Sequence, residues 1–277
     1  SIMSLAIHIF KDEYEKHFLH QLISSQLDVD RLDYLCRDSF FCGVTEGSVA
    51  SARILKMMNV KDGRLVVEAK GIYSVEKFLV ARRLMYWQVY LHKTSVAYEN
   101  MLVSALLRAK ELASKGVELF ASPTLKFFLY NDINRERFTS DPKCLENFIL
   151  LDDNDIWTAL KVWCNHNDII LATLSQGMVN REIFKVEVSP TPCTEERLNA
   201  ISERIAKQLH ISKEDTRYFI STPSIEKNMY NPADDSIDIL YNDGSTTNIA
   251  EASDMLHLSV LSKKVKKYYI CYLREKK

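Results

Sequence analysis

The stretch from Asp28 to Asp38 concentrates side chains that could do chemistry. Its eleven residues include four carboxylates, two guanidiniums and one phenol. If the stretch is helical, Asp30, Tyr34 and Asp38 follow one another at i, i+4 and i+8 and share one face. Arg31 joins the edge of that face. A stripe of acidic, aromatic and basic groups suits a ligand that carries phosphate and a metal ion.

An ordinary structural role competes with this interpretation. A helix rich in Asp and Arg is often a solvated face with i,i+4 ion pairs. Two features favour a site: Asp28 and Asp30 open the run, and Leu27, Leu32 and Leu35 are spaced to hold the opposite face in a core. A carboxylate at the edge of a buried helix needs a cation or hydrogen-bond donors to offset its desolvation.

Residues 27–38 (LDVDRLDYLCRD), followed by Gly43-Val44, resemble a motif of the HD-domain phosphohydrolases. The resemblance is to the deoxynucleoside triphosphate triphosphohydrolase branch. In that family the second Asp of the motif is the last ligand of a divalent metal ion, which is otherwise held by a His and a His-Asp pair.

The resemblance implies a role for each matching residue. Asp30 would be the metal ligand, and Arg31 would hold triphosphate oxygens. Tyr34 would pack on the sugar, and Asp38 would accept a hydrogen bond from a sugar hydroxyl. Asp30 and Arg31 are thus the candidate catalytic groups of this segment.

A second segment, residues 81–93 (ARRLMYWQVYLHK), resembles the Arg-rich helix of the same family. There, one Arg contacts the phosphates and a Tyr lines the sugar pocket, and these positions match Arg82 and Tyr90. Leu91 replaces a Gln that some members use, which affects the expected selection of base or sugar. A surface pair made of Arg82 and Arg83 is the ordinary alternative.

A third segment, residues 180–185 (NREIFK), resembles one whose Arg and Lys bind activating nucleotides in regulated members. Arg181, Lys185, Lys93 and Lys70 would form such an effector site. Ordinary surface cations are the alternative.

One departure from the family pattern limits these expectations. None of the seven histidines is followed by Asp, and the motif begins only 28 residues into the sequence. We therefore expect the C-terminal portion of an HD protein, which by itself holds no stable catalytic metal and hydrolyses little. His17 and His20, at i and i+3, are expected to be exposed or at the edge of the core.

Glycine and proline are scarce, which predicts long helices in the first half of the chain. Only seven Gly and six Pro occur, and every Pro lies beyond residue 120. The expected helices cover residues 12–41 (one or two helices), 45–58, 74–115 (two helices or one bent one, ending at Gly116), 122–131, 143–149, 153–166 and 194–210. The expected strands cover residues 64–70, 183–188, 216–221, 236–241, 246–249 and 268–273, with a hairpin turn at 242–244. We expect a mainly α, HD-like but incomplete helical core over residues 1–180 and a small α+β lobe over residues 181–277.

Bulk composition excludes several classes of protein. The chain has 277 residues and a formal net charge of −1, which does not favour nucleic acid as the main partner. Its six cysteines form no CxxC pair, and no apolar run approaches a membrane span. We expect a cytoplasmic protein with reduced thiols and no membrane partner. The resemblance adds the expectation of a homo-oligomer, a dimer or a tetramer.

These observations predict a metal-dependent hydrolase that converts a deoxynucleoside triphosphate to a deoxynucleoside and triphosphate in the intact protein. Two alternatives stay open at this point. One is a non-catalytic nucleotide-binding or assembly module, and the other is an HD hydrolase of a different phosphoester.

Overall fold

The computed structural model describes residues 1–227, 230, 235–254 and 265–275. They belong to two compact units, each with its own hydrophobic core. The first unit comprises Ser1–His92 and Glu226–Lys266, and the second comprises Lys93–Ile225 and Lys267–Lys277. Both units are largely helical, and each contains a small sheet, so the expected fold class, mainly α with an α+β portion, is confirmed.

The two units do not follow the expected boundary between residues 180 and 181. That boundary lies inside the second unit, where strand β3 (Lys185–Ser189) packs on helix α6 (Lys93–Ser114). The stretch 181–277, which we expected to form one lobe, is shared between the units because part of it pairs with strands of the first unit.

The first unit contains helices and a sheet. Its helices are α1 (Ile2–Phe10), α2 (His17–Ile23), α3 (Val29–Cys42), α4 (Ser51–Met57), α5 (Ile72–Met85) and α13 (Ile249–Ala252), with a 3₁₀ turn at Ala69–Gly71 and a π-helix at Tyr86–Tyr90. Its strands are β1 (Met58–Lys61), β2 (Arg64–Glu68), β6 (Asp238–Leu240) and β7 (Thr246–Asn248).

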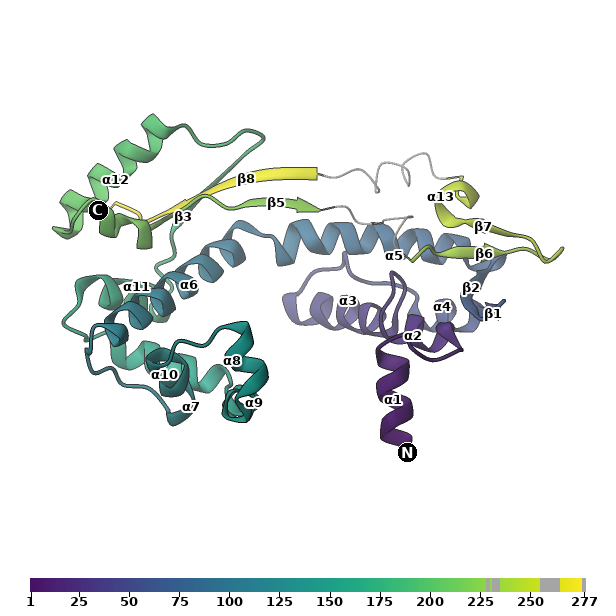
Figure 1. Cartoon of the computed structure of the whole chain (residues 1–277). Coiled ribbons are helices and arrows are strands. Elements are labelled where there is room, and N and C mark those ends of the chain that lie inside the picture. Colours follow the sequence, from purple (N-terminus) through teal and green to yellow (C-terminus); the bar gives the residue numbers. More distant parts are fainter. Residues whose placement is uncertain (228–229, 231–234, 255–264, 276–277) are drawn as a thin grey trace. The chain divides into compact units, whose positions relative to one another are not determined.

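Helix α3 has clear signals at both ends. The Asp28 side chain caps its N-terminus, and Gly43 ends it in the left-handed conformation with φ of 66°. Leu32 and Leu35 on its buried face join the core of the unit. Figure 1 shows α3 running beside α5, with which it packs.

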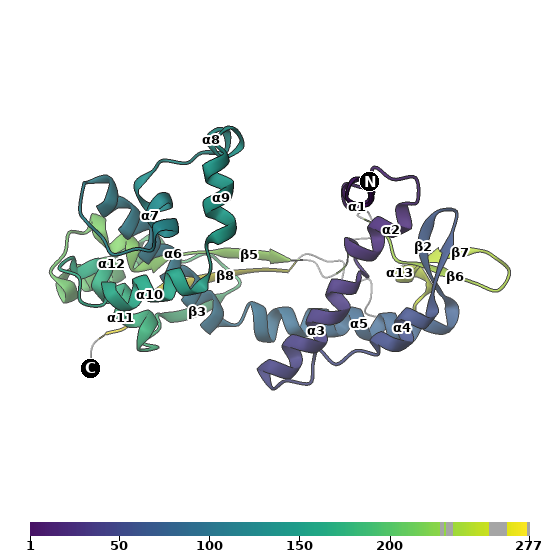
Figure 2. The ribbon, with the colours of Figure 1, turned by 90° about the horizontal axis from the view of Figure 1, so that it is seen from below.

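The sheet of the first unit joins two hairpins in the order β1-β2-β6-β7. The first hairpin turns at Asp62 and Gly63, and the second turns at residues 242–244, as expected. The hairpins meet through a parallel pair, in which Val67 lies opposite Ile239. Figure 2 shows β2 next to the β6–β7 hairpin.

The expected helical run 74–115 is interrupted. Helix α5 ends at Met85, and a π-helix continues it to Tyr90 before α6 begins in the second unit. Within the π-helix, Leu91 N donates to Tyr86 O at 2.7 Å, one residue further back than an α-helical bond. Single π-turns of this kind occur often at functional sites.

The second unit packs its helices around a mostly apolar core with a second small sheet. Its helices are α6 (Lys93–Ser114), α7 (Pro123–Tyr130), α8 (Arg135–Ser140), α9 (Pro142–Leu150), α10 (Asp153–Trp163), α11 (Ile169–Val179) and α12 (Glu195–Leu209), with a 3₁₀ turn at Glu214–Tyr218. Its strands are β3 (Lys185–Ser189), β4 (Ile220–Ser221) and most of β8 (Val265–Tyr272), while β5 (Ser224–Lys227) crosses the division between the units.

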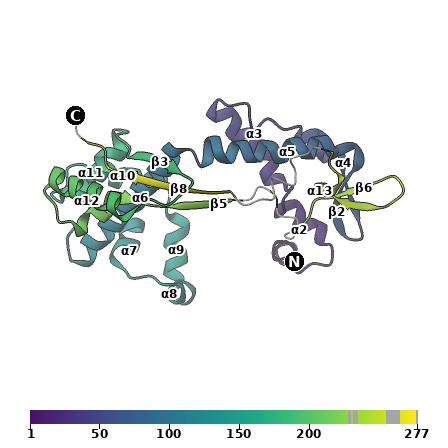
Figure 3. The same cartoon turned by 90° about the horizontal axis from the view of Figure 1, so that it is seen from above.

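Strand β8 pairs antiparallel with both β3 and β4. Figure 3 shows β3 and β8 together in this unit. Residues 216–221, expected to be a strand, are mostly the 3₁₀ turn followed by the short β4. None of the described helices has the length and apolar character that crossing a membrane requires.

Candidate functional site

The start of α3 holds Arg31 in a fixed position. The guanidinium Nε lies 3.1 Å from Asp28 Oδ2 and donates to Ser25 O at 2.7 Å. Burial opposes the positive charge, but the Asp28 carboxylate and the Tyr34 hydroxyl outweigh it, so the pKa of Arg31 is raised. Arg31 is therefore a permanent, half-buried cation.

Helix α5 places a second guanidinium, that of Arg82, close to the first. Its Nε and Nη1 are buried and have no hydrogen-bond acceptor among the described residues, while its Cζ lies 5.9 Å from the centre of the Tyr86 ring. Burial, and then the nearby charge of Arg31, lower the pKa of Arg82. Two cations thus share a small volume in which Arg82 lacks an anionic partner from the described chain.

Three tyrosines adjoin these cations. The rings of Tyr34 and Tyr90 meet edge to face with centroids 6.0 Å apart, and those of Tyr86 and Tyr90 meet at 5.4 Å. Burial, and then the neighbouring Tyr86 phenol, raise the pKa of Tyr34. The Tyr34 phenol therefore stays neutral at physiological pH, and the three rings offer an aromatic wall with hydroxyl groups.

Tyr90 and Asp38 are joined by a hydrogen bond between α5's π-helical extension and α3. Tyr90 Oη donates to Asp38 Oδ2 at 2.7 Å. Burial and this bond raise the pKa of Tyr90. Because a carboxylate can accept several hydrogen bonds, Asp38 keeps capacity for a second donor such as a ligand hydroxyl.

These contacts define a cluster on α3 and α5 that we call the basic–aromatic cluster. Its members are Arg31, Tyr34, Asp38, Arg82, Tyr86 and Tyr90. The structure thus brings together five of the residues that the sequence singled out, although their roles in catalysis stay predictions.

Asp30, the expected metal ligand, lies in the first turn of α3 with an exposed side chain. It has no hydrogen-bond or ion-pair partner in the part of the chain that the structure describes. A stable site for a divalent ion needs several fixed ligands. Among the described residues, no three His, Cys, Asp or Glu side chains gather into a set that could hold a metal ion. The described residues therefore offer the Asp30 carboxylate without a surrounding set of metal ligands.

The two early histidines serve a structural role at the join of α1 and α2. His17 Nδ1 bonds to Asp12 Oδ1, and His20 Nδ1 bonds to the backbone oxygen of Ile9 at 3.1 Å. Both rings are half-buried and stack with centroids 6.1 Å apart. This agrees with the expected place at the edge of the core.

The four residues expected to bind an activating nucleotide lie in different units. Lys70 belongs to the first unit, whereas Lys93, Arg181 and Lys185 belong to the second. Lys185 is paired with Glu187 at 3.3 Å. Arg181 is exposed, has a left-handed backbone with φ of 60°, and lines a pocket of the second unit together with the aromatic rings of Tyr98 and Trp157.

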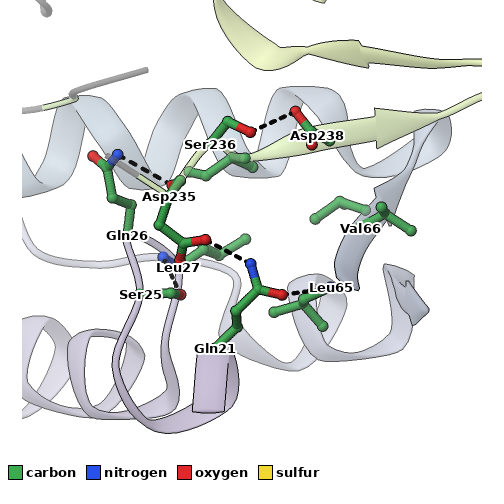
Figure 4. A pocket seen from close by; sticks show the side chains of 11 residues that line it. Gln21, Ser25, Gln26, Leu27, Leu65, Val66, Asp235, Ser236 and Asp238 are labelled. Atoms are coloured by element: carbon green, nitrogen blue, oxygen red, sulfur yellow. Dashed lines mark hydrogen bonds between the residues drawn. The ribbon is translucent and has the colours of Figure 1, made fainter. Parts of the chain in front are cut away.

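A separate small pocket of the first unit is filled by a polar junction (Figure 4). Asp235 accepts from Gln21 Nε2 at 2.6 Å and from Arg64 Nη2 at 3.2 Å, while Gln21 Oε1 accepts from Leu65 N at 2.7 Å. The amide of Gln26 reaches the backbone oxygen of Asp235 at 3.2 Å. Because its polar groups bond to one another, this junction holds residues 235–238 to α2 and β2 and needs no ligand.

Sequence reasoning did not single out two members of the site region. Tyr86 stands midway between Arg82 and Tyr90, at i+4 from one and i−4 from the other, and this spacing was a usable signal. Asp28 was visible only as part of an acidic run; its burial and its pairing with Arg31 depend on the loop before α3.

Comparison with known proteins supports a relationship over nearly the whole chain. Residues 49–121 match the protein family described as HD associated region. The crystal structure of a phosphohydrolase from Bacteroides thetaiotaomicron superimposes with a TM-score of 0.94 and 71% sequence identity. That superposition covers 98% of this chain and 67% of the crystallised one.

Two further relatives match shorter stretches. The uncharacterised protein YwfO of Bacillus subtilis is 33% identical over 178 residues, which are 64% of this chain and 39% of that protein. A Dictyostelium discoideum homolog of the deoxynucleoside triphosphate triphosphohydrolase SAMHD1 is 28% identical over 101 residues, covering 35% of this chain and 19% of that protein. The chain thus spans about two fifths of the Bacillus protein it matches.

Proposed function

Because the chain belongs to the HD-domain phosphohydrolase family, we propose that the whole protein hydrolyses deoxynucleoside triphosphates. The products would be a deoxynucleoside and inorganic triphosphate. The name of the Dictyostelium relative supports this substrate class, and the basic–aromatic cluster supplies the chemistry it needs.

The observation that carries the proposal is that Nε and Nη1 of Arg82, which lies beside Arg31, are buried without an acceptor among the described residues. These two nitrogens are hydrogen-bond donors, and the charge of Arg82 lies near the like charge of Arg31. An unsatisfied buried donor costs about 1–3 kcal/mol, so the site favours an anion that accepts from both guanidiniums. A triphosphate chain offers several negative oxygens in a row and fits this demand.

The tyrosines and Asp38 support the sugar end of the proposed substrate. Tyr34 and Tyr90 provide ring surfaces next to the cations, and Asp38 retains acceptor capacity beside its bond from Tyr90. A deoxyribose could therefore pack on the rings and donate one hydroxyl to Asp38. This arrangement would orient the α-phosphorus relative to Arg31 and Arg82.

The proposed reaction breaks one bond and forms one. A water oxygen adds to the α-phosphorus, the bond from that phosphorus to the 5′ oxygen breaks, and the 5′ oxygen takes up a proton. That proton comes from the attacking water, the deoxynucleoside leaves through its 5′ oxygen, and the triphosphate keeps the water oxygen. Arg31 and Arg82 would stabilise the negative charge on the triphosphate oxygens.

Proteins of this family commonly use a divalent ion to polarise the phosphoryl group and activate water. Asp30 is the ligand that the resemblance implies, and no set of ligand side chains surrounds it among the described residues. We therefore propose that the 277 residues alone bind nucleotide through the basic–aromatic cluster but hydrolyse it negligibly, so that on their own they act as a nucleotide-binding module.

An activating nucleotide and a homo-oligomer complete the proposal. Arg181 beside Tyr98 and Trp157 offers a cation and ring surfaces to a nucleotide, and Lys93 is exposed in the first turn of the same unit's α6. Binding of a fluorescent nucleotide to the Arg181→Ala variant would test the first part, and light scattering would test the second.

The experiment that tests the function compares Asp30→Ala with Asp33→Ala in the whole protein supplied with a divalent metal ion. Both side chains are exposed on α3, but Asp33 is bonded to Arg37 at 2.8 Å. We expect hydrolysis of deoxynucleoside triphosphates to fall at least 100-fold for Asp30→Ala and to stay within twofold for Asp33→Ala. Unchanged turnover by a folded Asp30→Ala protein would remove Asp30 from the site.

A further inference from the structure

Asp28 is a buried carboxylate at the start of the candidate site. Its relative exposure is 3%, although ionised side chains are seldom buried without partners. Oδ1 accepts from the backbone N of Arg31 at 2.7 Å, and Oδ2 accepts from the backbone N of Ser25 at 3.1 Å. These two bonds cap α3, and an uncharged Asn or Ser would serve that purpose almost as well.

A third contact of Asp28 uses its negative charge. Oδ2 lies 3.1 Å from Arg31 Nε, which also donates to Ser25 O at 2.7 Å. The Nε atom thus donates its hydrogen to the loop before α3 and also lies in ion-pair contact with the Asp28 carboxylate. The two Nη groups of Arg31 are left for the neighbouring Tyr34 hydroxyl and for a ligand.

The ion pair between Asp28 and Arg31 matters because Arg31 lies beside a second cation. Arg31 and Arg82 repel each other, and the nearby carboxylate of Asp38 is bonded to Tyr90. Asp28 is the ion-pair partner of Arg31 among the described residues. Without it, the bond to Ser25 O would have to hold Arg31 against the repulsion from Arg82, and conformations of the flexible side chain that point toward solvent would be more populated.

We propose that Asp28 is a positioning residue that aims the Arg31 guanidinium at the triphosphate without touching the ligand itself. This rests on the proposed function. Only a guanidinium can satisfy the arrangement, because Nε bonds to the loop while separate Nη atoms reach the anion. An ammonium at position 31 would carry the charge and lose the tether.

The test measures binding of inorganic triphosphate to the whole protein by calorimetry, together with KM and kcat for a deoxynucleoside triphosphate. The variants are Asp28→Asn, Arg31→Lys and the double variant, with Asp33→Asn as the matched control. Asp33 is also an Asp of α3 bonded to an Arg, but it is exposed and lies outside the cluster.

We expect Asp28→Asn and Arg31→Lys each to weaken triphosphate binding about tenfold, and the double variant to be no worse than Arg31→Lys within twofold. Asp28→Asn should raise KM more than it lowers kcat, and Asp33→Asn should match the wild type. If Asp28 only capped the helix, Asp28→Asn would lower the unfolding midpoint, and the coupling energy between positions 28 and 31 in triphosphate binding would be zero.

Three results would overturn the inference. Asp28→Asn could bind triphosphate as tightly as the wild type, or its effect could simply add to that of Arg31→Lys. If Asp28→Asn fails to fold, unchanged binding by Arg31→Lys alone would refute the tether. Failure of the wild type to bind triphosphate would instead refute the proposed function, and the inference with it.

Discussion

Replacing Arg82 by Met should make the unliganded protein more stable while it destroys triphosphate binding. Arg82 carries two buried N–H groups without an acceptor among the described residues. Met has a similar length and no polar hydrogen, so it fills the same space without that penalty. Such a trade between stability and function is expected where a site is prepared for a ligand that is absent.

The magnitude follows from the contacts of Arg82. Buried donors without an acceptor destabilise the folded state by about 1–3 kcal/mol. The contact of Arg82 with the Tyr86 ring stabilises it by about 0.5–1 kcal/mol. The net gain on substitution should be about 1–2 kcal/mol, which corresponds to a rise of roughly 0.5–1 M in the urea midpoint. Arg83→Met, on the same helix, should change stability by less than about 0.5 kcal/mol.

Urea unfolding measures the effect, and hydrogen exchange of peptides from α5 assigns the transition to the first unit. Adding inorganic triphosphate at 100 times its Kd should stabilise the wild type by about 2.7 kcal/mol and leave Arg82→Met unaffected. A lower midpoint for Arg82→Met, or equal stabilisation of both proteins by triphosphate, would refute the reasoning.

Two further predictions concern the framework of each unit. In the second unit, hydrogen bonds from Lys115 and Tyr218 lower the pKa of Glu111 to about 2. The contribution of Glu111 to stability is therefore full above its ordinary pKa near 4.5 and is lost as the pH falls toward 2. Glu111→Gln should flatten the loss of stability between pH 5 and pH 2 in urea titrations, and an unchanged slope would contradict this. In the first unit, a Cβ at Gly47 would clash with the Leu35 carbonyl oxygen of α3. Gly47→Ala should therefore cost about 1–3 kcal/mol of stability and displace α3, whereas Ser48→Ala should be neutral. Equal unfolding midpoints for the two variants would count against this close packing.

The elements with local signals were predictable from the sequence. Asp28 and the leucines that follow it predict α3, and the Asn242-Asp243-Gly244 turn predicts the β6–β7 hairpin. The resemblance to a known motif added the expectation that Arg31, Tyr34 and Asp38 belong with Arg82 and Tyr90, and the structure places them together.

Features that depend on distant pairing were not predictable. The parallel pair of β2 with β6 joins Val67 to Ile239, and nothing in either short strand specifies its partner. Helix α11 was not predicted because its sequence is apolar on nearly all sides and lacks the contrast of an amphipathic helix. The π-helix likewise has no simple sequence signal, and it contains both Tyr86 and Tyr90.

The central claim is best tested by identifying the products that the whole protein forms from a deoxynucleoside triphosphate and a divalent metal ion in ¹⁸O-labelled water. We predict equal amounts of deoxynucleoside and inorganic triphosphate, with the label in the triphosphate, because water adds to the α-phosphorus. Release of pyrophosphate with a monophosphate, release of single phosphate, label in the 5′ hydroxyl, or no turnover would contradict the account.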